Sequence, residues 1–600
     1  MSEMLFKKTD YTLQGLLTDI DIGRIGLPDI QRPFVWTNAK VRDLLDSMYR
    51  GYPVGYLLFW ETGATSDRSR TIGAGGKQKA PSLLIVDGQQ RLTSLYAVMR
   101  GIPVLRDNFQ HETVRIAFNP MDGKFEVPDA TTDRTPEFLP DISAVLAKDS
   151  FSVITSYLSR IEVTRVPTDD ERDRAIKAIT RLFELPGYPF VALELSSIAT
   201  EEQVADVFVR INSEGKKLNQ SDFILTLMSV FWDEGRTALE EFSIETRRPP
   251  SSLGAASGYN QIFQPEPDSL LRVGVGLAFR RGRLQHTYSL LRGKDLQTGQ
   301  FSQQQREQQF ERLRTAQARV LDPTHWADYL NVVRAAGYRN ARYVSSEMAL
   351  VFGYQFYLIG RTEYGVPPHA LKQAVARWLF MSLLTGRYTG ATETQFEKDL
   401  ALLPASGDAD AFLRTLAEVG DSELTADYWD KTLSMELATS SGRSPSLFAY
   451  YAALVLCDAR ALFSKGRVAD LLDPPASGKK KALERHHLYP KRYLNTLKIE
   501  GVRETNQIAN FALVEWDDNI AISNIAPKDY WPRYASRFSA SELETMMRWH
   551  ALPADWWHMN YSDFLRARRP LIAHVIRDGF SLLATGVQAE KAPSMAVVPK

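Results

Sequence analysis

Residues 82–96, Ser-Leu-Leu-Ile-Val-Asp-Gly-Gln-Gln-Arg-Leu-Thr-Ser-Leu-Tyr, constrain the fold of this chain more than any other stretch. The short apolar run from Leu83 to Val86 is typical of a buried strand. Leu92, Leu95 and Met99 then recur at helical spacing, which predicts a helix directly after the strand. A strand that enters a helix through a glycine turn leaves free backbone N–H groups at the helix start, and these favour an anion such as a phosphate.

The turn itself holds five residues whose side chains suit a nucleotide: Asp87, Gly88, Gln89, Gln90 and Arg91. An arginine here can add a bidentate phosphate contact. The aspartate can hold Mg²⁺ or a sugar hydroxyl, and the glutamines can orient a water molecule or contact a base edge. The alternative is an ordinary surface turn whose polar residues only cap the helix.

Composition limits the class of protein. A chain of 600 residues is too long for one core and predicts two to four domains. With 72 basic and 72 acidic residues the net charge is zero, so nucleic-acid binding must come from local basic patches. The single cysteine, Cys457, excludes internal disulfides and fits a cytoplasmic protein. We expect no signal peptide and no membrane span.

The string Asp-Gly-Gln-Gln-Arg followed by Leu-Thr-Ser-Leu resembles the signature of the N-terminal domain of GmrSD-type, modification-dependent (type IV) restriction endonucleases, a domain similar to ParB and sulfiredoxin folds. Two further segments resemble the same family: Pro-x-x-Gln-Arg-Pro-x-x-Trp at 28–36 and Phe-x-Arg-Ile-Asn-x-x-Gly-x-x-Leu at 208–218. The resemblance implies a nucleoside triphosphate site at the turn, with GTP, ATP and UTP all open. It adds four residues to that site: Gln31, Arg32, Arg210 and Asn212.

Two linkers by composition, 249–258 and 439–445, divide the chain. We therefore expect an α+β multidomain protein. Its predicted parts are an α/β domain over 1–248, which the resemblance implies is ParB/sulfiredoxin-like, a helical middle region over 259–434, a C-terminal domain with a helical tail over 445–585, and a disordered tail over 586–600.

An ordered set of histidines and asparagines marks the C-terminal part. His486-His487-Leu488-Tyr489-Pro490 is followed by asparagines at 506, 510, 519 and 524. A neutral imidazole can take a proton from water at neutral pH, and one Mg²⁺ or Mn²⁺ can stabilise a phosphate and its leaving oxygen. The set resembles an HNH (His-Me finger, ββα-metal) nuclease, in the version that ends GmrSD-like proteins. A structural zinc site is the alternative, but no cysteines lie nearby to build one.

By that resemblance, His487 is the general base, and His486 and Asn519 are the metal ligands. Asn510 is the middle asparagine, which ties down the loop and helps to orient His487. Many relatives carry an acidic residue where this chain has His486, so the ligand field is softer here. Two choices stay open: Asn510 or Asn506, and Asn519 or Asn524.

Basic residues surround this motif and form a candidate DNA-backbone surface. They are Lys479, Lys480, Lys481, Arg485, Lys491 and Arg492. The sequence therefore predicts an NTP-regulated, metal-dependent endonuclease that acts on foreign DNA, with modified phage DNA as the expected target; a homo-oligomer is left open. Two rivals are an NTP-switched DNA-binding protein with a degenerate nuclease and a ribonuclease or abortive-infection toxin.

Overall fold

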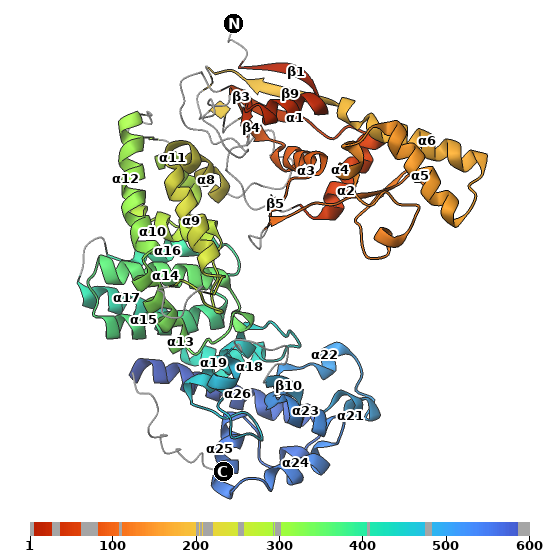
Figure 1. Cartoon of the computed structure of the whole chain (residues 1–600). Helices are drawn as coiled ribbons and strands as arrows, with labels where there is room; N and C mark the ends of the chain where they lie inside the picture. The colour runs from red at the N-terminus through yellow and green to blue at the C-terminus, as the bar shows by residue number, and fades with distance from the viewer. Residues whose placement is uncertain are drawn as a thin grey trace. The chain divides into compact units, whose positions relative to one another are not determined.

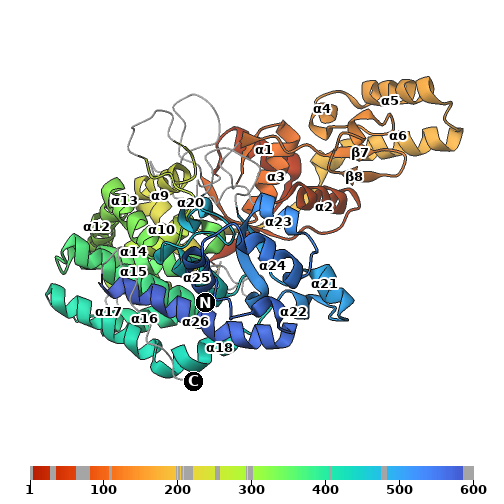
Figure 2. The same cartoon turned by 90° about the horizontal axis from the view of Figure 1, so that it is seen from below.

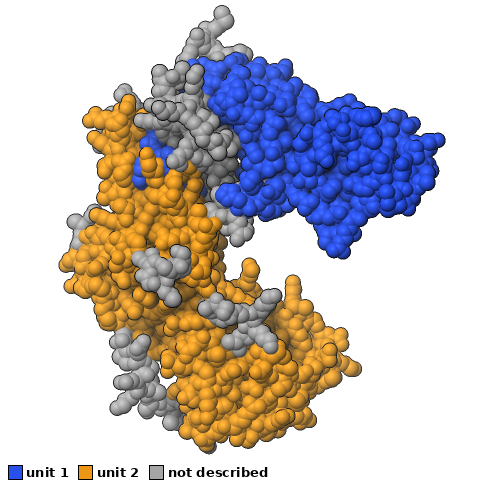
Figure 3. Space-filling model, viewed as in Figure 1, with its two compact units in different colours: residues 1–233 blue, residues 234–600 orange. Residues whose placement is uncertain are grey.

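The computed structural model describes residues 5–26, 36–61, 82–106, 111–197, 199, 203–204, 207, 220–249, 257–291, 293–294, 302–404, 408–473 and 483–585. The chain divides into two compact units, residues 1–233 and 234–600 (Figure 3). The helices and strands of the two units are shown in Figure 1.

The first unit is built on a five-stranded mixed sheet with the strand order β1-β9-β3-β4-β2. β9 and β3 are parallel, as are β4 and β2, whereas β1–β9 and β3–β4 are antiparallel. The five strands are β1 (Phe6–Thr12), β2 (Ile25–Gly26), β3 (Leu57–Glu61), β4 (Leu83–Asp87) and β9 (Pro189–Leu195).

Successive side chains of a strand point to opposite faces of the sheet, and both faces of this sheet are apolar. On one face, Phe59 and Ile85 pack in the main core with residues of α1, α2 and α3. On the other face, Leu58 and Leu195 form a smaller cluster. The helices are α1 (Leu13–Asp21), α2 (Asn38–Tyr49) and α3 (Gln89–Arg100).

The remaining elements of the first unit include a helical hairpin, α5 (Ser150–Thr164) and α6 (Asp169–Phe183), whose helices lie side by side in Figure 2. Two small antiparallel hairpins join β5 (Val104–Leu105) to β6 (His111–Glu112) and β7 (Ala117–Asn119) to β8 (Lys124–Glu126). α4 (Ile142–Leu146) and α8 (Gln220–Phe231) complete the unit.

The second unit starts with helices. They are α9 (Asp233–Glu245), α10 (Pro267–Phe279), α11 (Leu284–Leu291), α12 (Gln303–Val320), α13 (Pro323–Ala335), α14 (Glu347–Thr362), α15 (Pro368–Thr385), α16 (Thr392–Leu402), α17 (Ala409–Glu423), α18 (Leu433–Glu436), α19 (Pro445–Leu456) and α20 (Val468–Leu472). This confirms the predicted helical middle region. Its aromatic residues Trp378, Phe380 and Tyr388 are buried in the core.

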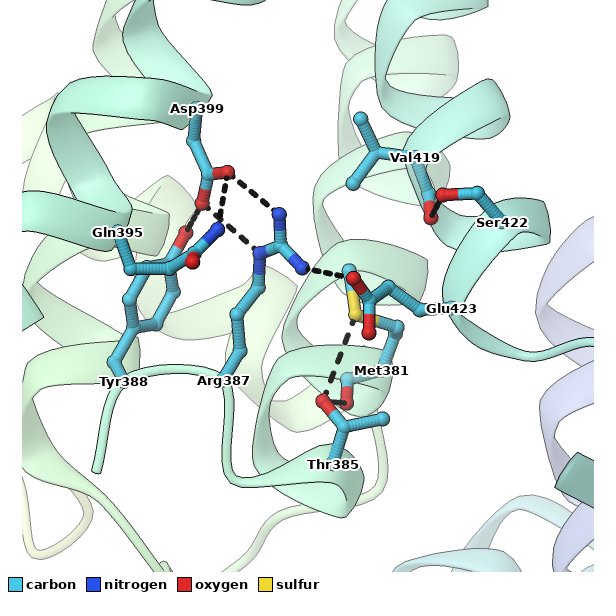
Figure 4. A network of polar contacts seen from close by, with 9 residues as sticks. All are labelled: Met381, Thr385, Arg387, Tyr388, Gln395, Asp399, Val419, Ser422 and Glu423. Atoms are coloured by element: carbon cyan, nitrogen blue, oxygen red, sulfur yellow. Dashed lines mark hydrogen bonds and ion pairs between the residues drawn. The ribbon is translucent and has the colours of Figure 1, made fainter. Parts of the chain in front are cut away.

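A buried ion pair fixes one corner of this helical region (Figure 4). Asp399 accepts two hydrogen bonds from Arg387, at 3.0 and 2.6 Å, and one from the Tyr388 hydroxyl at 2.6 Å. Arg387 also binds Glu423 at 2.7 Å, so α16 and α17 are tied to the end of α15. Each charge in the corner has a partner of opposite sign, as a buried ion pair requires.

The C-terminal elements pack on the helical region in the same unit. They are β10 (Leu483–His487), α21 (Lys491–Thr496), α22 (Val502–Thr505), β11 (Phe511–Glu515), α23 (Trp516–Ile522), α24 (Pro527–Ala535), α25 (Ala540–Trp549) and α26 (Tyr561–Thr585). α26 lies beside α19 and α15 (Figure 1).

The observed division differs from the predicted domain limits. It falls at 233–234 rather than at 249–258, because α9 packs with the second unit: Phe242 contacts Trp326, and Gln317 donates to the Gly235 carbonyl. The predicted middle and nuclease parts share one unit, and the predicted tail 586–600 lies outside the described residues. No helix in the described part of the chain is both long and apolar enough to cross a membrane.

Candidate functional site

Two antiparallel strands and a following helix bring the predicted C-terminal residues together. β10 ends with His486 and His487, which lie opposite Ala512 and Phe511 of β11. α23 follows β11 directly and packs against both strands. The loop between the strands, 488–510, contains α21 and α22. The chain therefore leaves the sheet after His487 and returns to it at Phe511, opposite His487.

His487 is held by Asn506 in this loop. Its Nε2 lies 3.0 Å from Asn506 Oδ1. An amide oxygen only accepts, so Nε2 carries the hydrogen and Nδ1 keeps its lone pair. Burial lowers the pKa of His487, and the nearby charges of Lys491 and Arg485 lower it further, while the bond to Asn506 opposes them. The ring is therefore neutral at neutral pH.

His486 is almost completely buried, with 3% of its surface exposed. Its Nδ1 lies 2.8 Å from Asn519 Oδ1 on α23, whereas Nε2 is buried without a hydrogen-bond partner. Burial lowers the pKa of His486 to about 4, against the effect of the Asn519 bond. Of the two open choices for this position, Asn519 is the residue that touches His486, while Asn524 is exposed and donates to Ser523.

Asn510 holds the loop rather than the histidine. Its Oδ1 accepts the Tyr489 N–H at 2.8 Å, and its Nδ2 donates to the carbonyls of Tyr489 (3.0 Å) and Thr505 (3.2 Å). The side chain is fully buried. The two functions that we predicted for one middle asparagine are thus divided: Asn510 ties down the loop, and Asn506 contacts His487.

His486 Nδ1 and Asn519 Oδ1 are joined by a hydrogen bond, and their spacing would also suit two neighbouring ligands of one divalent cation. Adjacent ligands of an octahedral ion with bonds of about 2.05 Å lie about 2.9 Å apart, close to the 2.8 Å between Nδ1 and Oδ1. The neutral ring carries one hydrogen, which lies on Nδ1 in the hydrogen bond to Asn519, so binding a cation through Nδ1 would require the tautomer with the hydrogen on Nε2. Among the described residues, no group of three or more His, Cys, Asp or Glu side chains could hold a metal ion. The pair therefore supplies only neutral ligands.

Three predicted DNA-contacting residues lie in the described part of this region. Lys491 and Arg492 are exposed at the start of α21. Arg485 donates to the Gly442 carbonyl at 3.0 Å, which fixes its side chain beside the strand pair. Lys479, Lys480 and Lys481 lie outside the described residues.

The predicted N-terminal turn has the expected form. β4 ends at Asp87, Gly88 has a φ of 90°, and α3 starts at Gln89. A Cβ on Gly88 would lie 2.4 Å from Leu57 Cδ2, so both the backbone angle and the space require glycine. The strand–turn–helix prediction is confirmed, and Gln90 Oε1 and Thr93 Oγ1 are buried at the start of α3 without hydrogen-bond partners.

Arg91 points towards the protein rather than away from it. Its two terminal nitrogens donate to the carbonyls of Val54 and Tyr56, and Asp87 lies 3.5 Å away. Burial lowers the pKa of Arg91, and Asp87 opposes this shift. The guanidinium thus fastens the segment before β3 to the turn. The predicted phosphate contact of Arg91 would need this arrangement to change.

Four residues predicted for the nucleotide site lie outside the described residues: Gln31, Arg32, Arg210 and Asn212. The sequence reasoning also missed side chains of α26 that bind the loop 504–509, because no motif marks them. The spacing of Tyr561 and Arg568, two helical turns apart, is the only signal in the sequence that places them on one face.

Comparison with known proteins identifies part of the first unit. Residues 13–229 match the family described as GmrSD restriction endonuclease, N-terminal domain. A segment of 82 residues is 35% identical to an uncharacterized protein of Methanocaldococcus jannaschii. That match covers 12% of this chain and 14% of the relative, so the chain spans only a small part of the relative's length. Residues 13–229 of the first unit are thus similar to a GmrSD-type N-terminal domain.

Proposed function

We propose that this protein is a metal-dependent DNA endonuclease of antiviral defence that a nucleoside triphosphate regulates, with modified phage DNA as its target. The observation that carries the proposal is the contact of His487 with Asn506 and of His486 with Asn519. Both histidines end β10, Asn506 lies in the loop between β10 and β11, and Asn519 lies on α23. This arrangement has the element order of a ββα-metal (HNH) nuclease. The match of residues 13–229 to the N-terminal domain of a restriction endonuclease supports DNA as the substrate.

His487 is the proposed general base. Asn506 fixes the tautomer that leaves Nδ1 free to accept a proton from the attacking water. Because burial keeps the imidazole neutral, the base is ready at neutral pH. Asn510 binds the N–H and the carbonyl of Tyr489 and so holds the loop against the end of β10. The His487 ring therefore keeps its orientation.

His486 and Asn519 would hold the cation. A bound divalent metal would supply positive charge for a phosphate oxygen and for the leaving oxygen. Imidazole and amide ligands carry no charge, so the site attracts hard Mg²⁺ less than a carboxylate would. Lys491 and Arg492, exposed beside the site, would neutralise phosphates of the DNA backbone.

The N-terminal turn is the proposed nucleotide site. The start of α3 offers backbone N–H groups after Gly88, and the buried side-chain oxygens of Gln90 and Thr93 nearby have no hydrogen-bond partner. A ParB/sulfiredoxin-like fold for this unit is part of the proposal. The nucleotide would change cleavage only by binding one conformation better than another.

Digestion of matched DNA substrates tests the function. Phage DNAs with sugar-decorated bases, methylated bases or a sulfur-substituted backbone, and unmodified DNA, are incubated with Mg²⁺ or Mn²⁺ and with each NTP; the His487→Ala variant is the control. We expect wild-type protein to cut at least one modified DNA and the variant to cut none. Equal activity of the two proteins would refute the site. Cleavage of structured RNA in place of DNA would favour the ribonuclease alternative. NTP-dependent DNA binding without cleavage would favour a DNA-binding protein with a degenerate nuclease.

A further inference from the structure

Three side chains of α26 bind the loop segment 504–509. The Tyr561 hydroxyl donates to the Glu504 carbonyl at 2.8 Å. Arg568 Nη1 donates to the Ala509 carbonyl at 2.8 Å, and Arg569 Nη2 donates to Gln507 Oε1 at 3.1 Å. This one helix therefore contacts the segment near its start, its middle and its end.

Arg568 is unusual among the buried charges of this chain. It is fully buried, and it donates to the carbonyls of Ala509 and His550. Among the residues that the structure describes, it meets no carboxylate at ion-pair distance, whereas buried Arg387 pairs with Asp399 (Figure 4). Burying a cation without a counter-charge is costly, so the hydrogen bonds to these two carbonyls are the favourable interactions that offset it.

The other end of α26 is fixed in the helical region. Phe580 packs on Trp429 and Phe380, with ring centroids 5.6 and 5.8 Å apart, and Arg577 pairs with Asp430 at 3.1 Å. Gly579 approaches α19 so closely that a Cβ would lie 2.7 Å from Ala453 Cβ. The helix is thus anchored in the core of the unit, and it presents a rigid surface to the loop.

The anchored segment contains the partner of the proposed base. Asn506, which binds His487, lies between Glu504 and Gln507, and Asn510, the loop clamp, directly follows Ala509. A displacement of about 1 Å at a catalytic group costs about a hundredfold in rate. A small movement of this segment would therefore change the orientation of the His487 ring.

We propose that Tyr561, Arg568 and Arg569 are positioning residues, which hold segment 504–509 so that Asn506 and Asn510 keep the candidate nuclease site in its active geometry. This inference rests on the proposed function of that site. The three residues act through the segment that they bind. Their loss should lower the cleavage rate more than the affinity for DNA, because Lys491 and Arg492 lie outside the segment.

The test uses the full-length chain and two substitutions that remove little volume, Tyr561→Phe and Arg569→Met, alone and together. Two matched controls make the same chemical changes elsewhere. In Tyr354→Phe, a buried tyrosine loses one hydrogen bond to a carbonyl, at Val320, and in Arg566→Met, α26 loses an exposed arginine that pairs with Asp563. Nicking of supercoiled plasmid with Mn²⁺ is measured over a range of DNA concentrations, and amide hydrogen exchange is measured over 504–510.

We expect the double variant to lose about ten- to hundredfold in single-turnover rate, with the half-saturating DNA concentration and the melting temperature close to those of the controls. Exchange over 504–510 should become faster in the double variant alone. A rate equal to that of the controls, or unchanged exchange over 504–510, would overturn the inference. If wild-type protein nicks no DNA under any condition, the proposed function fails, and the exchange data still decide whether α26 holds the segment.

Discussion

Replacement of Arg91 by alanine should destabilise the first unit. The guanidinium joins three parts of the chain: the carbonyls of Val54 and Tyr56 before β3, the carboxylate of Asp87, and α3, which carries Arg91 itself. In Arg91→Ala the two carbonyls lose their donors, and the segment that leads into the central strand β3 is released.

The magnitude follows from these contacts. A hydrogen bond to a charged group contributes about 1.5–3 kcal/mol, and the Tyr56 bond is exposed, so we take the low end for it. The ion pair with Asp87 is partly exposed and contributes at most about 1 kcal/mol. The sum, about 3–5.5 kcal/mol, corresponds to a fall of about 6–22 °C in melting temperature for a unit of this size.

Calorimetric unfolding of the full chain, with NTP binding measured in parallel, checks this prediction. Arg91→Lys is the matched variant: it keeps the charge and one donor direction, so it should lose about half of the stability that Arg91→Ala loses. If instead Arg91 binds phosphate directly, affinity for NTP should fall by about ten- to hundredfold with little change in unfolding. Unchanged melting of Arg91→Ala would refute the reasoning from the Val54 and Tyr56 contacts.

Three further predictions concern the C-terminal site. His487→Ala should lower strand cleavage by about 10²–10⁴-fold while NTP binding persists, as plasmid nicking and calorimetry would measure. EDTA should stop cleavage; because His486 and Asn519 are uncharged ligands, Mn²⁺, Co²⁺ or Ni²⁺ should restore it better than Mg²⁺, and His486→Glu should shift this preference towards Mg²⁺. Burial lowers the pKa of His486 and of His550 to about 4, so the unfolded chain binds protons first as pH falls from about 6.5. The free energy of unfolding of the second unit should therefore decrease between pH 6.5 and 4, by up to about 2.7 kcal/mol per pH unit; denaturant titrations that show a constant value would contradict this.

Local patterns predicted the elements well where the signal lay within a few residues. Thr37 caps α2 through its side chain, as threonine commonly does before a helix, and the apolar run from Leu83 forms β4. The apolar run over 53–60 is typical of a strand, yet β3 begins only at Leu57. Gly55 has a φ of 89°, and Arg91 donates hydrogen bonds to the carbonyls of Val54 and Tyr56 on either side of it. The first part of the run is therefore a loop that Arg91 holds in place. Such a contact joins residues 35 or more positions apart and leaves no periodic trace in the sequence.

Domain limits were less predictable, because composition does not report packing. The linker at 249–258 is rich in proline, serine and glycine, yet α9 before it packs with the second unit through Phe242 and Trp326. A polar, small-residue segment marks where chain is exposed, and it does not say which core the neighbouring helix joins.

In the candidate site, too, the sequence pattern does not report how single side chains pack. The ordered histidines and asparagines narrow the choice to two residues at each position, and Asn506 and Asn510 are chemically identical. What separates them is the loop: α22 ends at Thr505, which leaves Asn506 facing His487 and turns Asn510 inward, where it binds both the N–H and the carbonyl of Tyr489. The helix that fixes this loop, α26, begins more than fifty residues later. Which asparagine contacts His487 and which one ties down the loop therefore depends on long-range contacts of Tyr561, Arg568 and Arg569. For this reason, substitutions in α26 test the site as directly as substitutions of the two asparagines.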